Sequence, residues 1–98
     1  MTNEWFLYVL ECVDGTLYTG ITNNVTKRLA IHNSNRGAKY TRGRTPCMLL
    51  TSCKIGSKSN ALKVEYAFKK LSRLEKMKYV SAGIEFFLTE LSSKDLIK

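Results

Sequence analysis

The sequence predicts an α+β domain in which a small three-stranded antiparallel sheet is flanked by helices, in the order β-β-α-β-α-α. Two β-rich runs near the start of the chain are joined by an Asp-Gly pair, which is a strong hairpin signal. A third β-rich run lies between segments whose apolar residues recur at helical spacing. Helices packed on one antiparallel sheet form an α+β arrangement, and 98 residues suffice for one such domain.

The first two strands are expected over residues 5–12 and 17–22. The first run is aromatic and β-branched, and it is apolar on both faces over most of its length. Asp14 and Gly15 join the two runs, because glycine tolerates the positive φ that a tight hairpin turn needs. Gly20, inside the second strand, indicates that backbone or a ligand approaches closely at that point.

A helix is expected over residues 25–33, where Asn23 or Asn24 can serve as its N-cap. Its inward-facing residues are expected to be Val25, Leu29 and either Ile31 or His32. The following residues, 33–46, have no apolar period and therefore predict a loop. Loops of this length in a compact domain are more often functional than not.

A third strand is expected over residues 47–54, followed by a helix over residues 60–71. Ser57 or Ser59 can cap this helix. Its apolar stripe is expected to consist of Ala61, Val64, Phe68 and Leu71.

A third helix is expected to start at Ser72, because a hydroxyl at the N-cap and Glu75 three residues later form a capping-box pattern. It should end near Gly83, a residue type favoured just past helix ends. We therefore expect a single domain over residues 1–83. Residues 84–98 form a tail whose apolar residues fit either a short strand or a short helix.

The net charge of +8 is concentrated in the middle of the chain. Residues 27–78 carry fourteen Lys and Arg but only two acidic residues, whereas residues 1–26 carry no base at all. The bases are distributed through segments with an apolar period, so they belong to a folded surface and not to a polycationic tail. This distribution favours a nucleic-acid partner.

The three cysteines, Cys12, Cys47 and Cys53, lie in strand-like runs and include no Cys-x-x-Cys pair. A tetrahedral zinc site would need all three to converge with His32. We expect reduced, structural thiols instead, which favours a reducing compartment. No apolar run approaches the ~20 residues that span a bilayer, and the N-terminus lacks secretory features, so a cytoplasmic protein without a membrane partner is expected.

Two tyrosine-bearing tripeptides lie on the expected hairpin: Leu7-Tyr8-Val9 on the first strand and Tyr18-Thr19-Gly20 on the second. Arg28 and His32 follow on the first helix, and Glu65 lies on the helix after the third strand. This layout resembles the GIY-YIG nuclease domain over roughly residues 4–82. It is most similar to the small stand-alone bacterial members, which share the type of Gly-Ala-Lys-x-x-Arg-Gly loop found at residues 37–43.

The resemblance implies catalytic roles for five residues. Tyr8 and Tyr18 would activate a water molecule, helped by the positive charge of Arg28, which lowers the pKa of a nearby phenol. Arg28 would also hold phosphate oxygens with its planar guanidinium. His32, one helical turn after Arg28, would orient or share a proton. Glu65 would hold one mostly hydrated divalent cation, Mg²⁺ or Mn²⁺.

The sequence departs from the family pattern in two places. Leu7 stands where the first tripeptide has its leading glycine, and residues 75–79 lack the amide side chain that many members carry there. Simpler interpretations of single residues also remain open. A strand tyrosine is often an amphipathic core residue, and Glu65 is placed to pair with Lys69 at i+4.

A surface that binds nucleic acid is also expected, with DNA favoured over RNA. The long loop combines bases with an aromatic residue, which suits phosphate contacts and stacking on an exposed base. The expected contact residues are Lys27, Arg36, Lys39, Tyr40, Arg42, Arg44 and Lys69.

The sequence therefore predicts a metal-dependent endonuclease that hydrolyses DNA phosphodiester bonds with low sequence specificity, in DNA repair or processing, as a monomer or weak dimer. The alternative is a catalytically weak or inactive nucleic-acid-binding module of the same fold. A third possibility is a structural protein-interaction domain.

Overall fold

The computed structural model describes residues 4–34 and 43–97, and it confirms the three-stranded antiparallel sheet. The strands are β1 (Trp5–Glu11), β2 (Leu17–Thr22) and β3 (Met48–Gly56). Their spatial order is β2-β1-β3, so β1 is central and β2 lies at one edge. The expected first and third strands differ from the observed ones by one or two residues at their ends.

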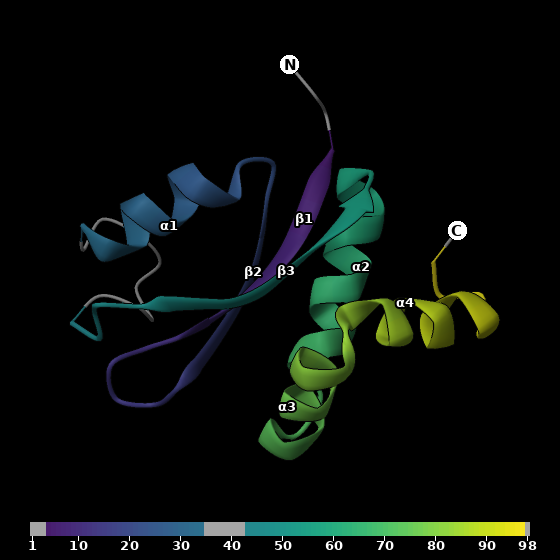
Figure 1. The fold of residues 1–98 in the computed structure, drawn as a ribbon. Coiled ribbons are helices and arrows are strands. Elements are labelled where there is room, and N and C mark those ends of the chain that lie inside the picture. Colours follow the sequence, from purple (N-terminus) through teal and green to yellow (C-terminus); the bar gives the residue numbers. More distant parts are fainter. Residues whose placement is uncertain (1–3, 35–42, 98) are drawn as a thin grey trace.

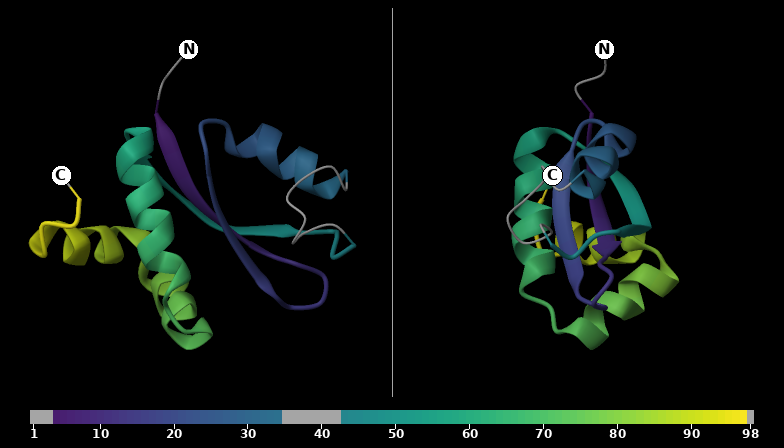
Figure 2. Two further views of the ribbon diagram at one scale, coloured as in Figure 1. Left: turned by 180° about the vertical axis from the view of Figure 1, so that it is seen from behind. Right: turned by 90° about the vertical axis from the view of Figure 1, so that its left-hand side faces the viewer.

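Four helices accompany the sheet: α1 (Val25–Asn33), α2 (Lys58–Lys69), α3 (Arg73–Ala82) and α4 (Ile84–Ser93). Helix α1 lies on one face of the sheet, and α2 lies on the other (Figures 1 and 2). The N-caps are Asn24, Ser57 and Ser72, each of which accepts a hydrogen bond from a backbone N–H of the first turn. None of these helices, within the part of the chain described, is long and apolar enough to cross a bilayer.

Of the two alternatives expected for the segment after Gly83, a short strand or a short helix, the helix is observed, so the element order is β-β-α-β-α-α-α. Gly83 ends α3 and begins α4, with a φ of 118° that side-chain-bearing residues rarely adopt. The sharp change of direction there lets Ile84, Phe87 and Leu91 return to the core. These residues are spaced as one helical face.

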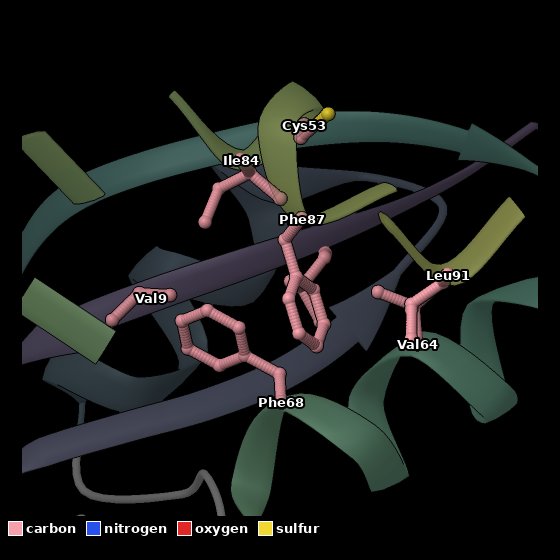
Figure 3. Close-up of a cluster of buried hydrophobic side chains, with 8 residues drawn as sticks. Val9, Cys53, Val64, Phe68, Ile84, Phe87 and Leu91 are labelled. Carbon is pink, nitrogen blue, oxygen red and sulfur yellow. The ribbon is translucent and has the colours of Figure 1, made fainter. Parts of the chain in front are cut away.

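The main apolar core fills the space between the sheet and helices α2 and α4. Its buried members are Leu7, Val9, Cys53, Val64, Phe68, Ile84, Phe87 and Leu91 (Figure 3). The rings of Phe68 and Phe87 meet edge to face at 5.5 Å between centroids. Helix α4 therefore completes the covering of this face together with α2.

A second, smaller core lies on the α1 face of the sheet. It contains Tyr8, Leu10, Cys12 and Cys47, with Tyr18, Leu29 and Leu49 packed against it. The Sγ atoms of Cys12 and Cys47 are 3.5 Å apart, whereas Cys53 lies in the main core. All three cysteines are free, buried thiols, and burial raises the pKa of Cys47 and Cys53 to about 11. The expectation of structural thiols is confirmed.

Candidate active site

Strand pairing places the two motif tyrosines on one face of the sheet. Tyr8 of β1 is opposite Gly20 of β2, and Leu10 is opposite Tyr18. Residues two apart on a strand share a face, so Tyr8 and Tyr18 are diagonal neighbours. Their ring centroids are 6.2 Å apart. Both tyrosines face α1.

Helix α1 places His32 in contact with this tyrosine pair. The imidazole is fully buried, and its Nε2 lies 2.9 Å from the hydroxyl oxygen of Tyr8. Its ring centroid is 5.0 Å from that of Tyr18 and 5.9 Å from that of Tyr8. Between Ile31 and His32, the two candidates for an inward position, the helix thus buries the histidine.

Burial fixes the protonation states of the Tyr8–His32 pair near neutral pH. It raises the pKa of Tyr8 to about 12, although the neighbouring Arg28 guanidinium opposes the rise. Burial, followed by the charge of Arg28, lowers the pKa of His32 below its ordinary value of 6.5. Tyr8 is therefore a phenol and His32 a neutral imidazole at pH 7, so the Tyr8 hydroxyl is able to donate to Nε2.

Arg28 lies one helical turn before His32, on the same face of α1. It is half-buried, and its charge opposes the rise in the pKa of Tyr8 and contributes to the lowered pKa of His32. Together with Lys27 and the β2–α1 connection, it lines a shallow pocket of about 190 Å³. A phosphate in this pocket would lie within reach of the guanidinium.

Gly20 provides the space that the Tyr8 ring occupies. A Cβ atom at this position would lie 2.6 Å from the Tyr8 hydroxyl oxygen and 2.8 Å from Cζ. Such distances are shorter than any van der Waals contact. The glycine of the second tripeptide is therefore required by the tyrosine of the first, which explains the close approach that the sequence indicated.

Replacing Gly20 by alanine is expected to lower the free energy of unfolding by about 1–3 kcal/mol, as overpacking does in well-packed sites. Chemical denaturation measures the loss. Tyr8→Phe removes the atom that is 2.6 Å from the new Cβ, so the same Gly20→Ala change should cost less in that background. An equal cost in both backgrounds would show that the steric explanation is wrong.

Glu65 is separate from the tyrosine group. It lies on α2, which covers the opposite face of the sheet, and its side chain is 21% exposed. Its Oε2 is 3.6 Å from the Nζ of Lys69, the i+4 partner that the sequence suggested. Lys69 in turn lines a pocket of about 300 Å³ together with Tyr18 of β2. Through Lys69, Glu65 is therefore next to a pocket that Tyr18 also lines at the β2 edge.

The donor set at Glu65 fits a mostly hydrated cation. In residues 4–34 and 43–97 no three Asp, Glu, His or Cys side chains gather into a metal-binding group. A single, partly exposed carboxylate suits Mg²⁺, which keeps most of its waters and takes further oxygens from a phosphate. It does not suit zinc, which needs three or four protein ligands.

The structure describes only some of the residues predicted to contact nucleic acid. Arg36, Lys39, Tyr40 and Arg42 lie outside the described residues. Arg44 donates to Asp14 at 2.8 Å, in an ion pair that ties residue 44 to the β1–β2 turn. Leu7, which stands in place of the family's glycine, is 1% exposed and packs in the main core, on the face opposite Tyr8.

The structure adds Lys76 to the site. This half-buried lysine of α3 lines the pocket beside Tyr18. In the sequence it is only one of several lysines on the later helices. Its position depends on a contact between α3 and the β1–β2 turn, where the Arg73 Nη1 donates to the carbonyl oxygen of Gly15 at 2.7 Å. The sequence contains no local signal for that contact.

Comparisons with known proteins agree with this layout. The family model described as the GIY-YIG catalytic domain matches residues 4–79. The chain is 51% identical over 79 residues to a UPF0213 protein of Bacillus licheniformis, covering 81% of each chain. It is 52% identical over 81 residues to a UPF0213 protein of Lactiplantibacillus plantarum, covering 81% of this chain and 80% of that one.

Solved structures show the same similarity. The solution NMR structure of a UPF0213 protein from Bacillus halodurans is 46% identical and has a TM-score of 0.54, covering 81% of this chain and 84% of that one. The solution NMR structure of a protein from E. faecalis is 42% identical and has a TM-score of 0.58, covering 84% and 90%.

Proposed function

Because this chain belongs to the GIY-YIG catalytic domain family, we propose that it is a metal-dependent endonuclease that hydrolyses DNA phosphodiester bonds with low sequence specificity. Tyr8, Tyr18, Arg28, His32 and Glu65 are the proposed catalytic residues. DNA repair or processing is the proposed setting, with DNA favoured over RNA as substrate, and a cytoplasmic monomer or weak dimer as the working form.

One observation supports this proposal most strongly: the Tyr8 hydroxyl lies 2.9 Å from the Nε2 of a fully buried, neutral His32. A phenol with a pKa of about 12 is a poor base at pH 7, because almost none of it is ionised. It can still take a proton if its own proton moves to a neighbour at the same time. His32 is that neighbour.

The proposed proton path follows from this geometry. Tyr18, which is more exposed than Tyr8, holds the attacking water beside the pair. As the water oxygen attacks phosphorus, its proton passes to the Tyr8 oxygen, and the Tyr8 proton passes to His32 Nε2. The departing sugar oxygen takes a proton from solvent, and His32 later releases its proton.

Arg28 would bind the non-bridging oxygens of the attacked phosphate. Its charge is fixed beside the tyrosines, so it stabilises the negative charge that grows in the transition state without reorganisation. Glu65 would hold Mg²⁺ or Mn²⁺, which supplies a Lewis acid for the phosphate oxygens when bound.

A second candidate function is binding of nucleic acid without efficient cleavage. The ion pair between Glu65 and Lys69 favours it, because the carboxylate already has a cationic partner in the absence of metal. Residues 75–79 also offer no amide side chain as a further ligand.

The test is a cleavage assay on supercoiled, single-stranded and branched DNA, and on RNA, with Mg²⁺, Mn²⁺ or EDTA. The proposal expects cleavage of DNA that requires the divalent ion, together with binding that weakens as salt is added. Salt-sensitive binding without cleavage of any substrate would support the second candidate. Neither binding nor cleavage would contradict both.

A further inference from the structure

Two basic pockets lie at opposite ends of the edge strand β2. The first, described above, is lined by Lys27 and Arg28 and reaches residues 22–24. The second is lined by Leu17, Tyr18 and Thr19 of β2 and by Lys69 and Lys76. From Leu17 to Thr22 the strand makes five residue steps, so at about 3.3 Å per residue the far ends of the two pockets are roughly 16 Å apart.

The second pocket has a positively charged lining, and the neighbouring carboxylates do not neutralise all of its charge. Lys69 has a carboxylate partner, Glu65, at 3.6 Å. The acidic residue of α3 is Glu75. Its carboxylate accepts a hydrogen bond from the Ser72 N–H at 3.0 Å, at the N-terminus of its own helix. Lys76 is thus the cation of this pocket whose charge is least neutralised by a neighbouring carboxylate.

The position of Lys76 is set by the docking of α3. The Arg73 guanidinium donates to the Gly15 carbonyl at 2.7 Å and lies 3.8 Å from a carboxylate oxygen of Glu11. Lys76 follows Arg73 by three residues and so projects from the same side of the helix. This anchoring brings the lysine to the Leu17 end of β2 and leaves it half-buried.

We propose that these two pockets are the ends of one binding track along β2, and that Lys76 binds a backbone phosphate of the same strand a few positions away from the one that is cleaved. This inference rests on the proposed function and specifies the path that the substrate strand takes across the protein. A span of roughly 16 Å exceeds the distance between adjacent phosphates, so the two pockets would hold phosphates that are not neighbours on the strand. Tyr18, which lines the second pocket, lies within the track.

The proposed role of Lys76 is to bind the strand and not to take part in the cleavage reaction. Lys76→Ala should therefore weaken binding of a fluorescein-labelled single-stranded oligothymidylate about fivefold, measured by anisotropy in EDTA so that no cleavage occurs. The slope of log affinity against log salt should fall by about one. In NMR titrations the oligonucleotide should shift the Leu17 and Thr19 amide signals of the wild type, and shift them much less in this variant.

Lys78→Ala is the matched control, since Lys78 is an exposed lysine of the same helix that lies near Glu75. It should retain affinity, salt slope and the Leu17 and Thr19 shifts. Equal behaviour of the two variants, with a wild type that binds, would overturn the track while leaving the proposed function intact. A wild type that binds no nucleic acid at all would overturn both. Thermal unfolding of each variant verifies that the fold is retained.

Discussion

Replacing Arg28 by alanine is expected to lower the rate of DNA cleavage by about 10²–10³-fold, the range found when one preorganised charge donor is removed from a transition state. The loss should fall mainly on kcat, because the guanidinium acts on charge that develops during the reaction. Arg28→Lys should recover only part of the rate, since an ammonium lacks the planar fork. Single-turnover cleavage at saturating Mg²⁺ measures both variants.

The pH profile gives the Arg28 prediction a second readout. The charge of Arg28 is one cause of the lowered pKa of His32, so its removal raises that pKa. The relay needs neutral His32, and activity therefore rises with pH through the pKa of this residue. In Arg28→Ala the acid limb should move to higher pH. Lys94→Ala, which removes an exposed charge just after α4, should leave rate and profile unchanged.

Replacing Glu65 by glutamine is expected to reduce metal-dependent cleavage by more than about 100-fold, because the carboxylate proposed to hold the cation is lost. Binding of DNA in EDTA should persist or tighten, since a negative charge has left a basic surface. The ion pair with Lys69 is partly exposed, so its loss should cost at most about 1 kcal/mol of stability. Cleavage is measured over a titration of Mg²⁺.

The control for Glu65→Gln is Glu90→Gln, on α4, whose carboxylate accepts from the Tyr79 hydroxyl at 2.7 Å. This variant should cleave DNA with an unchanged dependence on Mg²⁺. Full activity of Glu65→Gln at the same metal concentration would remove Glu65 from the site. Weaker binding of DNA in EDTA would instead show that Glu65 maintains the surface and not the cation.

The tyrosine pair could be predicted from the sequence because its placement depends on local signals. The Asp-Gly turn fixes the register of the hairpin, and the two-residue period of a strand then puts Tyr8 and Tyr18 on one face. Capping residues similarly mark the starts of the helices. The hydrogen bond between Tyr8 and His32 was harder to predict from the sequence, because the periodicity of α1 left both Ile31 and His32 as candidates to face inward.

Features that depend on contacts between distant segments could not be predicted. Gly83 marked a helix end, but the same residue also begins α4, and only the apolar core shows why the chain continues as a helix. Lys76 reaches the site through the contact of Arg73 with Gly15, which joins residues 58 positions apart in the sequence.

In the proposed enzyme, a cation held by Glu65 of α2 and the tyrosines of the sheet act on one phosphate at the edge of β2, although the two groups lie on different elements. The most direct measurement is paramagnetic broadening of amide NMR signals by substoichiometric Mn²⁺ in the presence of an oligonucleotide. Broadening is expected on both sides of the pocket, at Lys69 of α2 and at Tyr18 and Thr19 of β2, and it should be lost in Glu65→Gln. Broadening that persists in Glu65→Gln, or that never reaches β2, would contradict it.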